Sequence, residues 1–575
     1  MPNKLFLSTK SIEIVCDRNS DETRELVALF YPVTSNRLKT TFKLSPHLIP
    51  EVLKVFRNID ESNISTTPEA IQKLYAAEML ARDNTAELLK NGPRRAGMVT
   101  PLLTLDPHQQ LGREIAEYNN RFAFFYDTRT GKTPLALSIM YDDLQKNPTH
   151  KWLVICPLIL IHNAWLEDAA KFMPEIKVVN CHAATAAKRL KALQTPGQIF
   201  LTNTESFINY KEHFEQLGVV GCFVDESSDI KSASSKVSSA VVEFAQTVKR
   251  FYLLAGTPAP NGEWEYYMQM RAIDYYGWQS SNTQFELHYF VNMSYNSDYK
   301  KLCVRPDKKE QLMDKVKTVS MFLDKEDVLN TPGRVFIPIE YDMPDELKQS
   351  YMLMKDKLYV ELKDEIGETA TKILAMNIGV KLNKLNQISS GFIMDTLAAK
   401  ENKFCGTTLS EWYLLDDKRF KVLQDLLDSD GVRGESVLIW ANYRKEFEII
   451  RGILGARCAC VYGGVSNDEK NNAIALFKNK QVQYLVANPA SADKGLTLTV
   501  AHIAIYFSLN WSYELFKQSM ERIYGDKRIQ PLPCVYYVIL ANGTIDKILY
   551  EDVLQGKQEA SYKVLNHLKP EVVFK

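Results

Sequence analysis

RFAFFYDTRTGKT, residues 121–133, joins a strand pattern to a polar loop that contains a glycine. FAFFY (122–126) is continuously apolar instead of alternating, which is typical of a strand covered on both faces of a sheet. The polar run that follows ends in Gly131-Lys132-Thr133, and a helical pattern begins there. A buried strand, a tight loop and a helix in this order predict a phosphate-binding segment of a parallel α/β sheet.

Similar apolar runs recur along the chain and alternate with helical patterns, which indicates βαβ units and parallel sheets. The first series is FAFFY (122–126), WLVIC (152–156), IFLT (199–202), VVGCFV (219–224) and FYLLA (251–255). The second series is VLIWA (437–441), CACVY (458–462), YLVA (484–487), IAIYF (503–507) and VYYVIL (535–540). We therefore predict an α/β protein with two similar lobes in tandem.

The length of 575 residues, at roughly 150 residues per domain, predicts about four compact units. We expect a small N-terminal α+β accessory domain at 1–97, a first lobe at 98–280, helical protrusions with an inter-lobe linker at 281–430, and a second lobe at 431–575. In the accessory domain, 4–15, 25–33 and 40–44 have strand patterns, and a helix is predicted to begin at Pro68. This domain either selects the substrate or only packs against the first lobe.

The composition is that of a globular protein, with 45% hydrophobic and 24% charged residues, and it excludes collagen, disordered chains and small disulfide scaffolds. Lys plus Arg and Asp plus Glu number 70 each, so any basic surface for nucleic acid must be local. No apolar run approaches the roughly 20 residues that span a bilayer, and we expect neither a secretory leader nor a membrane partner. The nine cysteines include no C-x-x-C pair, which favours free thiols over a zinc site.

The loop after FAFFY has the residue types that a triphosphate requires. Backbone N–H groups around Thr130 and Gly131 and the start of the following helix can face an anion. Lys132 can reach the β and γ phosphates, and the Thr133 hydroxyl can ligate Mg²⁺. Arg129 stands where glycine normally lets the backbone approach the phosphate, so the loop departs from the usual form. A chance surface turn is the alternative interpretation.

Two other strands of the first series end in polar segments, and open α/β sheets have their binding crevice at such strand ends. VVGCFV is followed by Asp225-Glu226-Ser227-Ser228, where Asp225 can hold the Mg²⁺ shell and Glu226 can orient and deprotonate the attacking water. An isolated Asp-Glu pair would more often be a solvated turn. FYLLA is followed by AGTPAPN (255–261), which is either a turn that closes the strand or a relay from the nucleotide to a bound polymer.

The ordered set of segments resembles the Swi/Snf-type ATPases of helicase superfamily two over about residues 100–560. Leu105-Asp-Pro-His-Gln109 resembles the family's adenine-reading segment, and LVICPLILIHNAW (153–165) is similar to its first DNA-contacting segment. DESSDIKS (225–232) resembles the family's Asp-Glu-x-His segment with Ser228 in place of the histidine. KEDVLNTPGR (325–334) and LNQISSGFI (385–393) resemble the segments that lead into the second lobe.

The second lobe carries the same kind of resemblance in VLIWANY (437–443), VYGGVSNDEK (461–470), GLTLTVAHIAIYFSLNWS (495–512) and GTIDKI (543–548). Gln518-Ser-Met-Glu-Arg522 resembles the start of the arginine-finger motif. The family's second arginine would fall at Gly525, and we predict that a short insertion moves it to Arg528. The alternative is that Arg528 is a solvated surface residue.

The resemblance implies two RecA-like lobes that bind ATP and Mg²⁺ between them, with adenine against Gln109 and with Glu226, Asp225, Gln518, Arg522 and Arg528 as catalytic residues. It further implies that nucleic acid is held mostly through its phosphates. The candidate contacts are Pro157, Asn163, Thr202, Thr257, Gly495 and Thr497, with Trp511 either stacking on DNA or packing within the lobe.

The implied activity is ATP-driven translocation on double-stranded or branched DNA by a monomer in the cytoplasm or at the nucleoid, without a membrane partner. Arg129 in the phosphate loop indicates a phage-like or mobile-element-like member. Two alternatives stay open: a strand-separating helicase, and a degenerate ATPase that serves as a DNA-binding or protein-binding scaffold. Arg129, Ser228 and Gly525 are the residues that favour the scaffold.

Overall fold

The computed structural model divides the chain into two compact units, Met1–Met293 with Lys301–Val328, and Ser294–Lys300 with Leu329–Lys575. It describes residues 4–7, 12–17, 20–29, 34–35, 39–44, 48–55, 68–183, 185–278, 281–293, 302–368, 383–394, 412–491, 497–509 and 513–554. Among the helices in these ranges, none is both long and apolar enough to cross a bilayer. The eight cysteines in these ranges are all free, as the sequence predicts.

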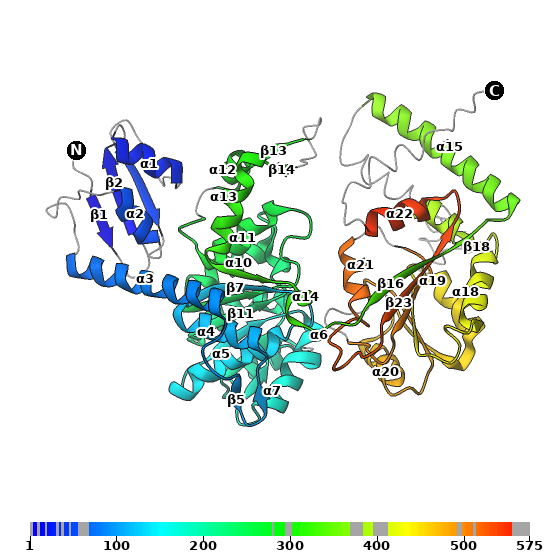
Figure 1. The fold of residues 1–575 in the computed structure, drawn as a ribbon, viewed down its shortest axis with the longest axis horizontal. Coiled ribbons are helices and arrows are strands. Elements are labelled where there is room, and N and C mark those ends of the chain that lie inside the picture. The colour runs from blue at the N-terminus through cyan, green and yellow to red at the C-terminus, as the bar shows by residue number, and fades with distance from the viewer. Residues whose placement is uncertain are drawn as a thin grey trace. The chain divides into compact units, whose positions relative to one another are not determined.

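The first unit begins with a small antiparallel sheet, drawn in blue in Figure 1, whose strand order is β1-β2-β4-β3. Its elements are β1 (Lys4–Leu7), β2 (Ile12–Asp17), α1 (Asp21–Leu29), β3 (Thr34–Ser35), β4 (Lys39–Leu44) and α2 (Ile49–Val55). Ile14, Phe42 and Leu26 are buried in its core. The α+β accessory module is therefore present, and α3 (Pro68–Asn91) follows it.

One predicted strand of this module is wrong, because ELVAL at 25–29 lies in helix α1. The Ser20 hydroxyl accepts a hydrogen bond from the Thr23 amide at 3.1 Å, as the N-cap of a helix does. Among the helix residues whose burial is described, Thr23 and Leu26, three residues apart, are buried. This spacing is typical of a helix, whereas the apolar content of the run alone suggests a strand.

The main sheet of the first unit has seven parallel strands in the order β15-β7-β12-β11-β8-β10-β9. Its strands are β7 (Arg121–Tyr126), β8 (Trp152–Ile155), β9 (Val178–Asn180), β10 (Ile199–Thr202), β11 (Gly221–Asp225), β12 (Arg250–Leu254) and β15 (Ser320–Leu323). The helices of this unit are α4 (Pro107–Tyr118), α5 (Lys132–Lys146), α6 (Leu158–Leu160), η3 (Ile161–Leu166), α7 (Glu167–Phe172), α8 (Ala186–Leu193), α9 (Thr204–Gln216), η4 (Ser227–Ile230), α10 (Lys236–Ala245), η5 (Glu263–Glu265), α11 (Tyr266–Ile273), α12 (Asn282–Tyr289), α13 (Pro306–Lys317) and α14 (Lys325–Val328). Two hairpins complete it, β5 (Met98–Thr100) with β6 (Leu103–Thr104), and β13 (Phe290–Asn292) with β14 (Leu302–Val304).

Helices cover both faces of this sheet, which is why its strands are continuously apolar. Phe124 and its neighbours on one face pack against α4, α5 and α7. Phe125 and its neighbours on the other face pack against α9, α10, α11 and α13. Successive side chains of a strand thus enter two different cores, which agrees with the predicted doubly covered sheet.

The second unit contains six parallel strands in the order β16-β23-β22-β19-β21-β20. The strands are β16 (Arg334–Tyr341), β19 (Val437–Trp440), β20 (Cys458–Val461), β21 (Tyr484–Ala487), β22 (Ile503–Tyr506) and β23 (Cys534–Ala541). Its helices are α15 (Asp345–Glu368), α18 (Lys418–Asp428), α19 (Arg444–Leu454), η7 (Gly455–Arg457), α20 (Asn467–Lys478), α21 (Tyr513–Met520) and α22 (Ile545–Leu554), and β17 (Phe392–Met394) pairs with β18 (Trp412–Leu414). The two parallel α/β lobes that the sequence predicts are therefore confirmed.

In the two parallel sheets, the described strands that the sequence does not predict are β9, β15 and β16, and each lies at the edge of its sheet. An edge strand has a neighbour on one side only, so it needs no continuous apolar run. β16 also contains Pro338, which edge strands tolerate, and several of its side chains are exposed. The segment 281–430, mainly helical by its sequence pattern, thus also supplies one edge strand to each lobe.

A buried ion pair explains two segments of the second unit that the sequence singles out. Arg419, at the start of α18, lies 2.9 Å from Asp546 in GTIDKI, and both side chains are 1% exposed. Asp546 also accepts a hydrogen bond from Ser389 in LNQISSGFI at 2.9 Å. The two segments, about 150 residues apart, therefore meet at one buried polar cluster in this unit.

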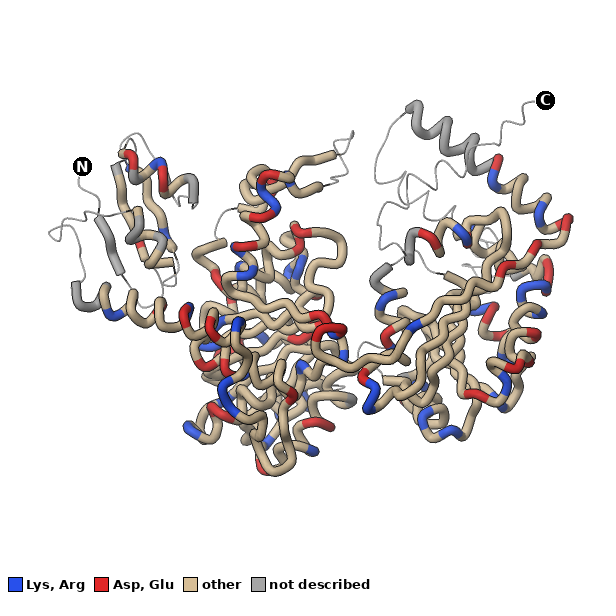
Figure 2. The backbone as a smooth tube through the Cα atoms, viewed as in Figure 1, with Lys and Arg blue, Asp and Glu red and all other residues tan. Residues whose placement is uncertain are grey.

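Figure 2 shows Lys and Arg residues interspersed with Asp and Glu along both units. This distribution agrees with the net charge of zero.

Candidate active site

The polar segments singled out by the sequence follow neighbouring strands of the seven-stranded sheet. β7, β12, β11 and β8 are adjacent and parallel, so their carboxyl ends lie at the same edge. The phosphate-type loop follows β7, Gly256 follows β12, Asp225 ends β11 and Pro157 follows β8. This edge is where open α/β sheets bind ligands.

The phosphate-type loop is closed by the helix before it. The side-chain amide of Gln109 donates a hydrogen bond to the carbonyl of Thr130 at 2.9 Å, and a ring nitrogen of His108 lies 2.7 Å from the same oxygen. Gly131 has φ +78°, and a Cβ there would stand 2.0 Å from the Gln109 amide nitrogen. The left-handed backbone favours glycine, a larger residue would displace the Gln109 side chain, and α5 begins at the next residue. The adenine-reading role of Gln109 stays a prediction.

Arg129, the departure from the usual loop, has a left-handed backbone with φ +65°. Glycine adopts this conformation without a steric cost, whereas other residues pay roughly 1–3 kcal/mol. The loop therefore keeps the shape of a glycine-containing turn although the residue is an arginine. Thr130 is buried, and its hydroxyl donates to the carbonyl of Asp127 at 2.8 Å, which fixes the turn.

Lys132 is held at the end of β7. Its ammonium donates to the carbonyls of Tyr126 and Asp127, at 3.0 and 3.3 Å. A Cβ built on Gly256 would stand 3.6 Å from the same Nζ atom, so the loop after β12 passes directly beside the lysine. The structure thus brings together the Gly-Lys-Thr segment and the Gly-Thr-Pro segment.

Asp225 and Glu226 stand at the end of β11. Asp225 is 6% exposed, and its two oxygens accept hydrogen bonds from the Trp165 indole and the Glu226 amide, both at 3.0 Å. Burial, together with the charge of Glu226, raises the pKa of the Asp225 carboxyl, although Lys132 and the Trp165 hydrogen bond act against it. Glu226 has φ +55°, a strained left-handed backbone directly after the strand.

The donor set fits Mg²⁺ as nucleotide-binding proteins hold it. Among the described residues, no Lys or Arg forms an ion pair with Asp225, and the charge of Lys132 offsets its burial only in part. The half-buried Thr133 hydroxyl has no hydrogen-bond partner in the same part of the chain. Mg²⁺ typically uses one or two such oxygens and completes its shell with phosphates and water.

Gln269, on helix α11, is a site residue that the sequence reading misses. It accepts a hydrogen bond from the Ser227 hydroxyl at 2.7 Å and donates to the carbonyl of Pro258 at 2.6 Å. One turn earlier on the helix, Glu265 accepts two hydrogen bonds from Asn261 and lies 3.3 Å from Lys231. The loops after β11 and β12 are therefore tied together by one helix.

A signal for this link exists in the sequence. EWEYYMQMRAI (263–273) contains four polar residues, and two of them, Glu265 and Gln269, are spaced four apart among apolar and aromatic neighbours. Such residues share one helix face, and buried polar groups need partners. A search for this spacing would have found them.

The residues of the first unit that are predicted to contact DNA lie in different environments. Pro157 and Thr257 are half-buried at the carboxyl edge, and Asn163 lies in the π-helical turn η3. Thr202 ends β10 with no exposed surface, and its hydroxyl donates to the carbonyl of Asn203. These roles stay predictions.

In the second unit, Gln518 lies on α21 and Arg522 is buried two residues after that helix ends. The Arg522 carbonyl accepts a hydrogen bond from the Leu498 amide at 2.8 Å, which links the motif to the segment of Thr497. Gly495 and Trp511 lie outside the described residues.

Arg528 projects from a structured loop, and its side chain is 67% exposed. Its guanidinium donates to both oxygens of Asp526, at 3.0 and 3.1 Å. Burial alone would raise the pKa of Asp526, but the hydrogen bonds and charge of Arg528 lower it. Gln530 closes the loop through hydrogen bonds to the carbonyls of Ile523 and Ala501. The finger role of Arg528 stays a prediction.

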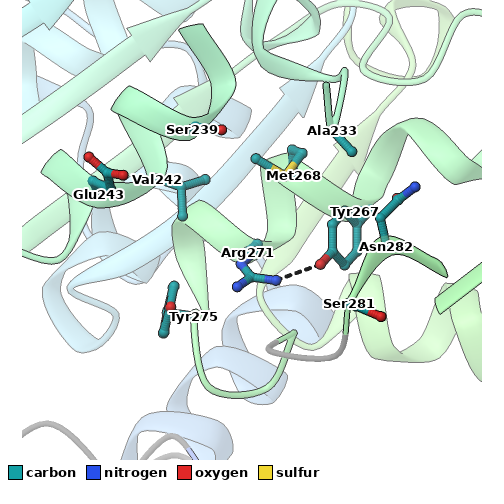
Figure 3. A pocket seen from close by; sticks show the side chains of 10 residues that line it. All are labelled: Ala233, Ser239, Val242, Glu243, Tyr267, Met268, Arg271, Tyr275, Ser281 and Asn282. Carbon is teal, nitrogen blue, oxygen red and sulfur yellow. Dashed lines mark hydrogen bonds between the residues drawn. The ribbon is translucent and has the colours of Figure 1, made fainter. Parts of the chain in front are cut away.

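A cavity of about 380 Å³ lies elsewhere in the first unit, beside α10, α11 and the start of α12 (Figure 3). Arg271 lines it, donates to the Tyr267 hydroxyl at 2.5 Å and lies over the ring of Tyr275. No predicted site residue is among the described residues that line this cavity. The candidate active site is therefore the strand-end cluster and not this cavity.

Comparison with protein-family models gives two matches in chain order. The model described as SNF2-related domain matches residues 60–390, and the model of the helicase conserved C-terminal domain matches residues 418–525. The first match alone covers more than half of the chain. The second ends at Gly525, just before the loop that carries Arg528.

The individual relatives share about a quarter or less of their residues with this chain. The chain is 24% identical over 438 residues to protein p41 of Acyrthosiphon pisum secondary endosymbiont phage 1, covering 74% of this chain and 89% of that protein. It is 21% identical over 461 residues to the SWI/SNF-related matrix-associated actin-dependent regulator of chromatin subfamily A-like protein 1 of Drosophila melanogaster, covering 76% and 52%. The chain thus spans about half the length of that animal relative.

Among solved structures, the chain is similar to the Sulfolobus solfataricus SWI2/SNF2 ATPase core in complex with dsDNA, at 19% identity. The alignment covers 82% of this chain and 98% of that chain, with a TM-score of 0.36.

Proposed function

Because the chain belongs to the SNF2-related family of helicase-like ATPases, we propose that it is an ATP-driven translocase on double-stranded DNA. We propose further that it remodels forks, branched DNA or protein–DNA complexes. The observation that carries the proposal is the convergence of Lys132, Asp225 and Gly256 from three adjacent strand ends of one sheet.

Hydrolysis follows from the roles of these residues. Lys132 and the amides at the start of α5 hold the phosphates, and Thr133 with Asp225 would hold Mg²⁺, which supplies charge neutralisation at the β and γ phosphates. Glu226 orients a water opposite the bond to the leaving ADP and accepts its proton as the oxygen attacks phosphorus. The products are ADP and inorganic phosphate.

Arg522 and Arg528 of the second unit supply the remaining charge in this proposal. The γ-phosphoryl group gains charge on its equatorial oxygens in the transition state, and arginines there can be worth about 10³–10⁵ in rate. Hydrolysis would then require the second unit to meet the nucleotide, and product release would separate them again. If each unit grips the same DNA, this cycle moves the protein along it.

Grip on DNA is proposed to use its phosphates. Such contacts carry no sequence information and need only local positive charge, hydroxyls and backbone amides. A neutral chain with interspersed charges is compatible with this mode of binding (Figure 2). The proposed contacts are Pro157, Asn163, Thr202, Thr257, Gly495, Thr497 and Trp511.

One observation favours a second candidate, a DNA-binding scaffold with little turnover. Arg129 keeps a strained left-handed backbone in the phosphate loop, and glycine is absent from that position. A bulky residue there limits the approach of the backbone to a phosphate. Lys132, Asp225 and Glu226 are all present, and this supports the translocase over the scaffold.

The test is steady-state ATP turnover with single-stranded, blunt, forked and four-way DNA, combined with a triplex-displacement assay on duplex DNA. A translocase shows duplex-stimulated turnover and displaces a third strand without separating the duplex. Release of a single strand from a fork would identify a strand-separating helicase instead. If the protein binds DNA but DNA does not stimulate its ATP turnover, the scaffold function is the one that remains.

A further inference from the structure

Trp165 contacts the carboxylate that the mechanism assigns to Mg²⁺. Its indole N–H donates a hydrogen bond to Oδ2 of Asp225 at 3.0 Å, and the residue is 1% exposed. The two residues lie on different connections, one after β8 and one at the end of β11. Since β8 and β11 are adjacent in the sheet, the bond joins two loops of the active-site edge.

The local backbone aims the indole inward. Residues Ile161–Leu166 form a single π-helical turn, a conformation that often occurs at functional sites because it changes the direction of side chains. Trp165 packs with Leu160, Ile161 and Ala169 in the core beside the sheet. His162, on the same turn, is exposed and faces Asn180. The same turn therefore directs Trp165 to the Asp225 carboxylate and His162 to the surface.

The bond has a consequence for the geometry of Asp225. With Oδ2 held by Trp165 and Oδ1 held by the Glu226 amide, the carboxylate plane is fixed before any ligand binds. Each carboxylate oxygen can accept a second partner, so the remaining acceptor sites are aimed in a defined direction. An indole donates only and does not titrate, so it cannot itself ligate a metal.

A second buried tryptophan in the same unit provides a contrast. Trp152 donates to Oδ2 of Asp143 at 2.9 Å, but Asp143 is also within 2.9 Å of His150 and 3.7 Å of Arg250. That carboxylate already has basic partners. Asp225 forms no ion pair with any described Lys or Arg, so the indole and one amide are what orient it.

We propose that Trp165 is a positioning residue that pre-orients Asp225 for Mg²⁺, and that it links the metal site to the segment after β8. The proposal rests on the proposed function, because Asp225 must hold Mg²⁺ with bound ATP. Hydrogen-bond partners of metal ligands typically change metal affinity by about 10–100-fold when they are lost. The role is distinct from packing, since it depends on one N–H group.

The test is a Mg²⁺ titration of nucleotide binding in the full chain, with a fluorescent ATP analogue as the probe. Trp165→Phe keeps an aromatic ring and removes the donor, and Trp152→Phe is the matched control that loses the same kind of bond. We expect Trp165→Phe to raise the half-saturating Mg²⁺ concentration about tenfold. Nucleotide binding measured in EDTA should equal that of the wild type for both variants.

A second variant separates the donor from the shape of the ring. Benzothienylalanine introduced at position 165 has the size of tryptophan but a sulfur in place of the N–H, and it should show the same shift as Trp165→Phe. A wild-type Mg²⁺ requirement for this variant overturns the proposal, as does an equal shift in Trp152→Phe. If the wild type itself shows no Mg²⁺-dependent nucleotide binding, the proposed function fails rather than this inference alone.

Discussion

Asp225→Asn should stabilise the protein in the absence of nucleotide while it abolishes ATP hydrolysis. The wild-type carboxylate is buried beside Glu226, and no described Lys or Arg pairs with it. An amide of the same shape has no buried charge and keeps the hydrogen bond from the Trp165 indole. Like a protonated carboxyl, it offers only one full acceptor oxygen, so its NH2 group faces the Glu226 N–H. The residue would thus be retained for function at a cost in stability.

The magnitude follows from the pKa of Asp225. Burial, followed by the charge of Glu226, raises it from 3.8 to about 6. Since one pKa unit corresponds to about 1.36 kcal/mol, the ionised carboxylate destabilises the native state by about 3 kcal/mol. The native state holds the proton more tightly than the unfolded chain. The penalty is therefore absent below about pH 4, grows as the pH rises, and is complete above the native pKa.

Hydrogen exchange of peptides from β11 and β12, measured on the full chain, is the suitable assay. A chain with two compact units does not unfold in one step, whereas local exchange reports the stability of this sheet alone. At neutral pH the Asn variant should exchange more slowly than the wild type. Near pH 4 the two proteins should exchange alike after correction for the intrinsic rates.

Asp142→Asn is the control with the opposite sign, because Asp142 makes two 2.7 Å bonds to Arg113. Loss of that ion pair should leave stability unchanged or lower it. The reasoning is refuted if Asp225→Asn is less stable than the wild type at neutral pH, or if its gain does not vary with pH.

Three other substitutions test separate parts of the account. Arg129→Gly should raise the stability of the first unit by about 1 kcal/mol, since it removes a left-handed non-glycine residue. Unchanged hydrogen exchange of peptides from β7 and α5 would contradict this. Arg419→Met should cost about 3–5 kcal/mol in the second unit, because it leaves Asp546 charged and buried, and a variant with wild-type unfolding would show that the pair is not needed. Arg528→Ala should lower DNA-stimulated turnover with little change in nucleotide affinity. Wild-type turnover of this variant would show that the finger lies elsewhere.

The fold could be predicted where burial on both faces leaves a continuous apolar run, as in FAFFY and VLIWA. Edge strands could not be predicted in this way. In β16, Pro338 and several exposed side chains give a sequence pattern that is typical of a loop. Helix α1 was mistaken for a strand, since its apolar content masked the helical spacing of Thr23 and Leu26. Local pattern thus predicts central elements better than peripheral ones.

The candidate site could be predicted in part, because parallel strands carry their following loops to one edge. Lys132 and Asp225 therefore meet although 93 positions separate them. Contacts that depend on tertiary packing were beyond the sequence. The Trp165 bond to Asp225 has no local signature, and the spacing of Glu265 and Gln269 marks a shared helix face without naming Ser227 as the partner.

ATP turnover by Glu226→Gln in the presence of duplex DNA tests the central claim most directly. The account predicts that this variant binds ATP as tightly as the wild type and hydrolyses none, while duplex DNA accelerates the wild type. Turnover by the variant at the wild-type rate would contradict the assignment of the site.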